Sequence, residues 1–183
     1  MQHDPDLLEA LAAFKPVPFD GVVFRATRQN LSPVAASTNG GRWMVPRAAP
    51  VLYTSQQREG SLAEISFHYA RMTPVPTKPV TVHRLQVSSR RTLKLIQADI
   101  ASLGVPREQY KEVGLLRTQQ IGAAVEYLGC DGLIAPSARW SCDNLILFPE
   151  RLAIDCELEI LESEEVEWLA WAKANGLYDH EEM

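Results

Sequence analysis

The sequence has few cysteines and no long apolar run. Its 183 residues include three cysteines, Cys130, Cys142 and Cys156, none in a CxxC pair, and an odd number cannot all pair in disulfides. We therefore expect reduced, structural thiols, including Cys130. No apolar run approaches the roughly 20 residues that span a bilayer. The segment MQHDPDLLEALAAF has acidic residues where a secretory signal would be basic. We expect a cytoplasmic protein without membrane contact.

Sequence motifs of common catalytic and cofactor sites are also missing. There is no GxxxxGK[ST] or GxGxxG phosphate loop and no GxSxG nucleophile elbow. The four histidines, His3, His68, His83 and His180, lack metal-ligand spacing such as HExxH, so we expect no metal. The net charge of −5 argues against nonspecific nucleic-acid binding, although it leaves room for a local basic pocket.

What is present suits one α+β domain spanning residues 1–183. Hydrophobic residues make up 46% and charged residues 22% of the chain, as in ordinary globular proteins. Helices are expected at 5–14, 56–72, 118–129 and 163–176, with one or two short ones within 99–117. Strands are expected at 22–27, 50–55, 80–87, 91–96, 131–137, 144–149 and 154–160, with loops between. The irregular alternation, without evenly spaced βαβ units, favours mixed or antiparallel sheets with flanking helices.

Three polar residues stand in or near the first two expected strands. Arg25 interrupts the apolar run VVFRA, so its guanidinium either faces water or finds a carboxylate or an anionic ligand. Arg42 follows two glycines, which let the backbone approach a ligand closely; a turn arginine paired with an acid is the alternative. Tyr53, near the end of PVLYTS, is either a core residue or a ring delivered to the edge of a cleft.

Two further residues have equally plain structural interpretations. Ser61 and Glu64 form an SxxE capping box if a helix begins there. Ser55 is an alternative N-cap, and an earlier start would leave Glu64 on an interior turn beside the strand of Tyr53. Ser137 follows a proline just after a strand, a position typical both of site residues on loops and of turns.

Taken together and in order, these pieces resemble the RES domain, a family named for arginine, glutamate and serine. The matching pieces are VFRAT, GGRW, VLYTS, SLAEISF, GCDGLIAPSAR and NLILFP. They extend from about residue 20 to residue 160. No single piece is specific, but six in the right order are. One departure is Met44, which stands where GRW or GRF is often followed by asparagine.

The resemblance implies a fold similar to that of ADP-ribosyltransferases and a bacterial toxin that consumes NAD+ as its substrate. It implies cleavage of the bond between nicotinamide and ribose. Glu64 would stabilise positive charge on the ribose and bind its hydroxyls. Arg25 and Arg42 would hold the phosphates or the adjoining ribose, and Tyr53 would stack on nicotinamide. Ser137 would bind the substrate or orient Glu64. The partner would be an antitoxin with a helix-turn-helix part that plugs the pocket.

Several alternatives stay open at this stage. The acceptor of the ADP-ribose group is water, phosphate or a protein side chain, and the last would make the chain an ADP-ribosyltransferase. A non-catalytic module that only binds a nucleotide or docks a partner is a further hypothesis. The acidic C-terminal helix, with Trp168 and Trp171 on one face, is either a docking face or packed into its own core. Formation of a homo-oligomer is also left open.

Overall fold

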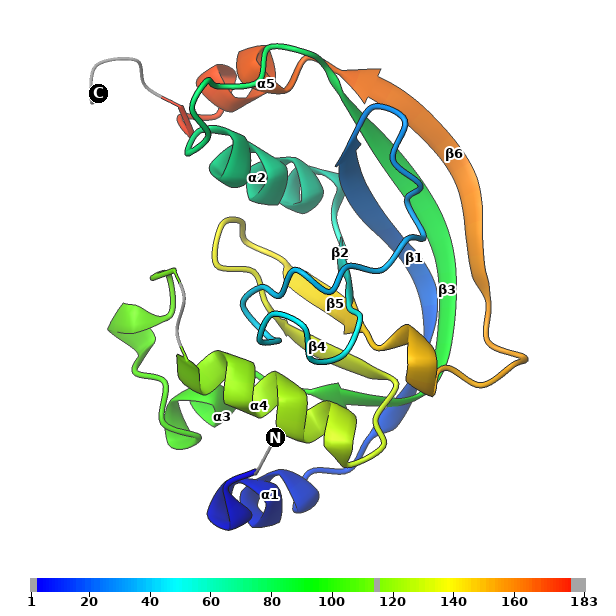
Figure 1. Cartoon of the computed structure of the whole chain (residues 1–183), viewed down its shortest axis with the longest axis vertical. Helices are drawn as coiled ribbons and strands as arrows, with labels where there is room; N and C mark the ends of the chain where they lie inside the picture. Colours follow the sequence, from blue (N-terminus) through cyan, green and yellow to red (C-terminus); the bar gives the residue numbers. More distant parts are fainter. Residues whose placement is uncertain (1–2, 114–115, 179–183) are drawn as a thin grey trace.

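A closed, barrel-like sheet organises the structure, a computed structural model that describes residues 3–113 and 116–178. Its strands are β1 (Val17–Arg28), β2 (Leu52–Ser55), β3 (Val80–Lys94), β4 (Gly132–Pro136), β5 (Asp143–Leu147) and β6 (Leu158–Val166). The order is β1-β2-β5-β4-β3-β6, and β1 also pairs with β3. The first five strands therefore close on themselves, with β6 added outside β3 (Figure 1). Only the β3–β4 pair is parallel among the pairs described. The predicted single α+β domain with a mixed sheet is confirmed.

The two faces of the sheet carry different kinds of side chain. An apolar cluster fills the inner face: Val23, Leu52, Leu85, Val87, Ile134, Leu145 and Leu147. Because side chains alternate along a strand, Tyr53 and Ser55 point to the face opposite Leu52, and Asn144 to the face opposite Leu145. The register pairs Ser55 with Asn144, so these two side chains share the outer face. The outer face of β2 and β5 thus carries polar groups.

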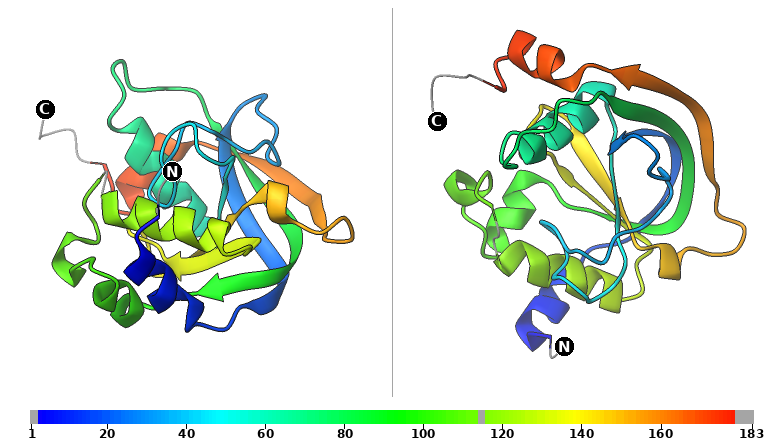
Figure 2. Two further views of the ribbon diagram at one scale, coloured as in Figure 1. Left: turned by 60° about the horizontal axis from the view of Figure 1, so that its bottom comes forward. Right: turned by 45° about the horizontal axis from the view of Figure 1, so that its top comes forward.

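Helices cover the outside of the sheet in two groups. α2 (Arg58–Tyr69) lies with α5 (Trp168–Ala174), and α4 (Leu116–Tyr127) lies with α1 (Pro5–Ala12) and α3 (Gln97–Ser102), as Figures 1 and 2 show. A 3-10 turn, η1 (Arg107–Gln109), follows α3, and another, η2 (Pro149–Arg151), follows β5. β4 and β5 run between the two groups, so residues leaving these strands meet side chains from both. In the described residues, no helix is long and apolar enough to cross a membrane.

The start of α2 decides between the two interpretations of Glu64. The helix begins at Arg58 after the N-cap residue Gln57, one turn before Ser61. The Ser61 hydroxyl donates to the Arg58 carbonyl at 2.7 Å rather than capping a helix start. The capping-box interpretation is therefore wrong. Ser55 is not the N-cap either, but the consequence drawn from an early start holds, because Glu64 lies on an interior turn.

The segment before α5 differs from the sequence prediction. A helix was expected from Ser163, yet β6 continues to Val166 and α5 begins only at Trp168. Residues of β6 pair with β3 from Leu158–Val87 to Val166–Val80, and these ladder hydrogen bonds override the helix propensity of the glutamates. β3 is one continuous strand instead of the separate strands predicted at 80–87 and 91–96, because its pairing with β1 extends from Val80 to Thr92.

The C-terminal helix packs into its own domain, which confirms the core interpretation for Trp168. The ring of Trp168 is 1% exposed and lies edge-on to Tyr69 and Tyr178, with ring centroids 5.2 Å and 6.0 Å away. Trp171 is half-buried, and its ring centroid is 5.8 Å from that of Trp140. The contact joins α5 to the turn between β4 and β5.

Outside β3, strand β6 presents a row of acidic side chains. Glu159, Glu162, Glu164 and Glu165 are exposed, as are Ile160 and Leu161. Two of the acids pair with arginines, one on α2 and one on β3. Arg58 contacts Glu164, and Arg84 lies 3.5 Å from Glu162.

Candidate active site

The carboxylate of Glu64 is the centre of the polar group on the outer face of the sheet. Its Oε1 atom accepts a hydrogen bond from the Ser137 hydroxyl at 2.7 Å and another from the Asn144 side-chain amide at 2.9 Å. The three residues come from α2, the β4–β5 turn and β5. Two donors on one oxygen fix the orientation of the carboxylate. No hydrogen bond to Oε2 occurs within the described residues, so this oxygen is available to a ligand.

Ser137 belongs both to the site and to a turn. Its hydroxyl oxygen accepts from the backbone N–H groups of Arg139 at 3.1 Å and Trp140 at 3.2 Å. Its own N–H donates to the Cys142 carbonyl at 2.8 Å. The turn therefore holds the hydroxyl in place while the proton of that hydroxyl points to Glu64. The turn interpretation of Ser137 is confirmed, and its role as a site residue stays a prediction.

Behind Asn144, a second layer of polar groups sets the amide orientation. The Ser55 hydroxyl donates to the Asn144 side-chain oxygen, which leaves the Asn144 NH2 group to face Glu64. The Cys142 sulfur lies 3.7 Å from the Ser55 hydroxyl, and burial raises the pKa of this thiol, which keeps it protonated. Gly60 on α2 permits this packing, because a Cβ there would lie 2.5 Å from the Cys142 sulfur and 2.6 Å from the Ser55 hydroxyl.

The GGRW turn packs against Tyr53. The turn closes with a hydrogen bond from the Gly41 N–H to the Met44 carbonyl at 2.9 Å, and the Trp43 N–H donates to the Tyr53 hydroxyl oxygen at 3.2 Å. A Cβ on Gly41 would lie 2.6 Å from that hydroxyl oxygen. Gly41 thus allows the backbone of the turn to lie close to Tyr53, where a side chain would clash. Trp43 and Met44 are buried core residues, so the departure at Met44 is accommodated by apolar packing.

Burial raises the pKa of the Tyr53 hydroxyl from its usual 10 to about 12. A folded-state pKa above the unfolded value means that this group stabilises the fold below pH 10 and loses that contribution as the pH rises to about 12. We expect the free energy of unfolding, measured by urea denaturation across this range, to fall more steeply in the natural protein than in Tyr53→Phe. The phenylalanine variant also loses the Trp43 contact, but equally at every pH. Parallel curves would contradict the assignment.

Arg42 reaches across to the segment after η1. Its guanidinium donates to the Tyr110 carbonyl at 2.5 Å and to the Glu112 carbonyl at 3.0 Å, and it lies 5.2 Å from the centroid of the Tyr110 ring. Its hydrogen-bond partners among the described residues are backbone carbonyls. The alternative prediction, that Arg42 pairs with an acidic side chain, is therefore wrong. The Tyr110 hydroxyl donates to the Pro136 carbonyl at 2.5 Å, beside Ser137. Arg42 therefore ties the GGRW turn to the strand that leads to Ser137.

Arg25 stands apart from this group. Its guanidinium donates to the carbonyls of Pro33 at 2.8 Å and Ala35 at 2.9 Å, and so fixes the loop after β1. Phe24 pairs with Ser55 and shares its face, so the alternation of side chains directs Arg25 to the other face, beside its partner His83. In the described part of the chain, no hydrogen bond joins Arg25 to Glu64, Tyr53 or Ser137. Its role in binding or catalysis stays a prediction.

Positive charge gathers near Glu64 although the chain as a whole is acidic. Burial lowers the pKa of Arg139, and the charges of Arg42 and Arg71 lower it further, while Glu64 opposes them. Three guanidinium groups therefore act on one another close to a single carboxylate. This arrangement can stabilise positive charge beside Glu64 and bind an anionic group next to it.

Sequence reasoning missed several residues of this site. Asn144 lies within the piece NLILFP, near the start of β5, and Arg139 lies within GCDGLIAPSAR, in the turn after β4. A polar residue next to an apolar strand is the signal that could have identified each of them. Tyr110 lies in an irregular segment and carries no such signal. Arg71 follows the end of α2, where a basic residue is common for reasons unrelated to binding.

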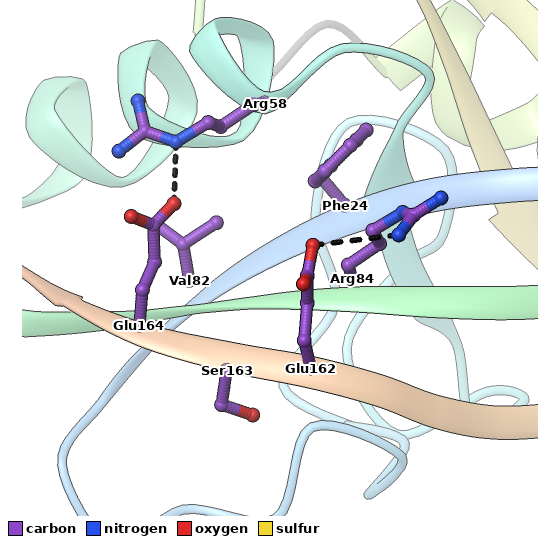
Figure 3. A pocket seen from close by; sticks show the side chains of 7 residues that line it. All are labelled: Phe24, Arg58, Val82, Arg84, Glu162, Ser163 and Glu164. Atoms are coloured by element: carbon purple, nitrogen blue, oxygen red, sulfur yellow. Dashed lines mark hydrogen bonds and ion pairs between the residues drawn. The ribbon is translucent and has the colours of Figure 1, made fainter.

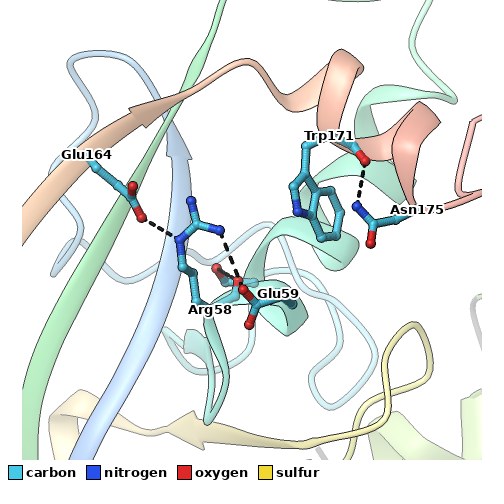
Figure 4. A network of polar contacts seen from close by, with 6 residues as sticks. Arg58, Glu59, Glu164, Trp171 and Asn175 are labelled. Carbon is cyan, nitrogen blue, oxygen red and sulfur yellow. Dashed lines mark hydrogen bonds and ion pairs between the residues drawn. The ribbon is translucent and has the colours of Figure 1, made fainter.

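Two cavities in the described structure lie elsewhere. One, of about 220 Å³, is lined by Phe24, Val82 and charged residues of β3, β6 and α2 (Figure 3). Its arginines are already paired with glutamates, including Arg58 with Glu164 and with Glu59 at 3.6 Å (Figure 4). The other, of about 550 Å³, lies between the end of β1 and the proline-rich connector at 73–79. Among residues 3–113 and 116–178, no group of three histidine, cysteine or acidic side chains could hold a metal ion.

Comparisons with known proteins agree with this architecture. A search of curated proteins gives no match. Among solved structures, a chain of the M. tuberculosis MbcT–MbcA toxin–antitoxin complex is similar, with a TM-score of 0.77 and 15% sequence identity over 94% of this chain and 98% of that chain. At this identity the likeness concerns the fold. The family model of the RES domain matches residues 20–169, which is most of the sequence. The chain therefore belongs to the RES domain family.

Proposed function

We propose that this chain is the toxin of a toxin–antitoxin pair and that it cleaves the nicotinamide–ribose bond of NAD+. The observation that carries the proposal is the Glu64 carboxylate, which Ser137 and Asn144 hold by one oxygen and whose other oxygen accepts no hydrogen bond from the residues that the structure describes. Membership of the RES family and the likeness in fold to a chain of a toxin–antitoxin complex support it. A relationship to the ADP-ribosyltransferase fold, which the family resemblance implies, is part of the same proposal.

The chemistry of this bond needs what Glu64 offers. As the bond to nicotinamide breaks, positive charge develops on the ribose in an oxocarbenium-like transition state. A fixed carboxylate next to the ribose stabilises that charge and also accepts a hydrogen bond from a ribose hydroxyl. Nicotinamide leaves as a neutral base, so the reaction requires no strong general acid. The ring of Tyr53, whose hydroxyl accepts a hydrogen bond from the Trp43 N–H, would stack on nicotinamide.

Water or phosphate serves as the acceptor in the preferred form of the proposal, so that NAD+ is depleted and growth stops. Transfer of ADP-ribose to a protein is the alternative outcome. Radiolabelled NAD+ in a cell lysate distinguishes them, since transfer gives a discrete labelled protein band. The partner would be an antitoxin with a helix-turn-helix part that covers the site. By blocking substrate access, it would keep the toxin inactive until the antitoxin is removed.

The test is release of nicotinamide by the purified chain. We expect free nicotinamide to accumulate from NAD+ in multiple turnovers, and induced expression of the chain to arrest growth as cellular NAD+ falls. Parallel assays with and without phosphate identify the acceptor from the product, ADP-ribose or its 1″-phosphate. Saturable NAD+ binding without turnover and without growth arrest would contradict the proposal and support a non-catalytic binding module.

A further inference from the structure

Two arginines next to Glu64 stack on the same aromatic ring. The guanidinium carbon of Arg139 lies 3.3 Å from the centroid of the Phe67 ring, and that of Arg71 lies 3.8 Å from it. Phe67 is one turn of α2 after Glu64, Arg71 follows the end of that helix, and Arg139 belongs to the turn of Ser137. The ring thus gathers two cations from separate segments. We call Phe67, Arg71 and Arg139 the arginine pair site.

The hydrogen-bond donors of this pair are uncommitted. Over residues 3–113 and 116–178, neither guanidinium contacts a carboxylate or donates to a carbonyl. Other arginines of the chain do, including Arg58, Arg84 and Arg117. Two like charges held close together repel each other, and Arg42 adds to the repulsion at Arg139. Such an arrangement is favourable once an anion neutralises it.

The two arginines expected from sequence to hold phosphates have their donors occupied instead. Arg25 donates to the carbonyls of Pro33 and Ala35, and Arg42 donates to those of Tyr110 and Glu112. Both act on the protein backbone. Stacking on Phe67, by contrast, leaves the edges of the Arg71 and Arg139 guanidinium groups with N–H donors for a planar, two-point contact with phosphate oxygens.

We infer that the arginine pair site binds the diphosphate group of the dinucleotide, with Arg71 and Arg139 on its phosphate oxygens. The inference rests on the proposed function for its substrate. The backbone of the Ser137 turn links Arg139 to the hydroxyl that holds Glu64, so diphosphate and ribose would be positioned from one turn. The site selects for a diphosphate ester over a ribosyl compound without phosphate.

Two substrates that share the scissile bond test this selectivity. Nicotinamide riboside has the same nicotinamide–ribose bond as NAD+ but no phosphate. For Arg71→Leu and Arg139→Leu, we expect the KM for NAD+ to rise roughly 10- to 100-fold with kcat little changed, as for loss of a charged hydrogen bond. The KM for nicotinamide riboside should stay the same. Equal changes with both substrates would overturn the inference.

Arg84→Leu is the matched control, since it removes the same charge from an arginine paired with Glu162 at a distance from this site. A second measurement is titration calorimetry with ADP, which carries the diphosphate but cannot react. Binding should be lost in the Arg71→Leu/Arg139→Leu double variant and kept in Arg84→Leu, with circular dichroism and thermal melting confirming that each variant folds. Retained ADP binding in the folded double variant would overturn the inference.

The two proposals fail separately. If the natural protein binds ADP through Arg71 and Arg139 but releases no nicotinamide, the diphosphate site stands and the proposed cleavage is wrong. If nicotinamide is released but neither ADP binding nor the KM for NAD+ depends on these arginines, the cleavage stands and the diphosphate site is wrong.

Discussion

We expect Glu64→Gln to lower the kcat of the proposed nicotinamide release from NAD+ by roughly 100- to 1,000-fold, the size of effect found when one stabilising group is removed from a transition state. Glutamine keeps the shape and the Oε1 acceptor, so Ser137 and Asn144 can still donate to it. The substitution removes the negative charge and leaves the packing. The loss should therefore appear in kcat, because charge on the ribose develops only as the bond breaks.

Glu59→Gln provides the control for this result. Glu59 lies on the same helix, more than one turn before Glu64, and its nearest charged partner is Arg58 at 3.6 Å. We expect its activity to match that of the natural protein. Thermal melting of both variants separates catalysis from folding. Full activity in Glu64→Gln would show that the carboxylate does not act on the ribose, whatever else the chain binds.

Gly122→Ala should destabilise the fold, against the ordinary preference of helices for alanine over glycine by about 1 kcal/mol. Gly122 lies inside α4, and a Cβ there would sit 1.7 Å from the Trp43 carbonyl oxygen, which no structure tolerates. Either the helix or the GGRW turn must move. We expect the free energy of unfolding, from urea denaturation, to fall by about 1–3 kcal/mol, as for overpacked cores.

The same substitution should also reduce activity, because Trp43 holds the Tyr53 hydroxyl and directly follows Arg42. Gly21→Ala is a suitable control. A Cβ at Gly21 meets its nearest neighbour, a carbon of Phe19, at 3.4 Å, which is an ordinary contact. An unchanged or increased free energy of unfolding in Gly122→Ala would mean that the turn has room to shift, and that its position matters less than the packing suggests.

Local sequence signals predicted much of the fold. The Asp4 cap, whose carboxylate accepts from the Asp6 N–H at 3.1 Å, and Gly129, with a φ of +77°, mark helix ends where residue chemistry demands them. The segment from 163 to 166 shows the limit of this approach. Its glutamates suit an exposed helix equally well, and only pairing with a strand some eighty residues earlier makes it part of β6.

The candidate site was predictable in part, for a related reason. Glu64 and Ser137 stand out as polar residues in apolar surroundings, and the structure joins them by a hydrogen bond. The contribution of Asn144 depends on the β2–β5 register, which puts it beside Ser55 on the outer face. The sequence predicted that the guanidinium donors of Arg42 would hold the substrate. In the structure one of them donates to the Tyr110 carbonyl, in an irregular segment far away in the sequence. Such long-range contacts leave no pattern in neighbouring residues.

Closure of the sheet has a consequence for how the chain behaves at high concentration. Because β1 to β5 close on themselves, β6 is the strand of the described sheet whose outer edge pairs with no other strand. Exposed apolar residues on such an edge, here Ile160 and Leu161, invite another copy to add its own strand. The glutamates on both sides of them make two such edges repel each other. The acidic side chains of β6 therefore disfavour edge-to-edge aggregation.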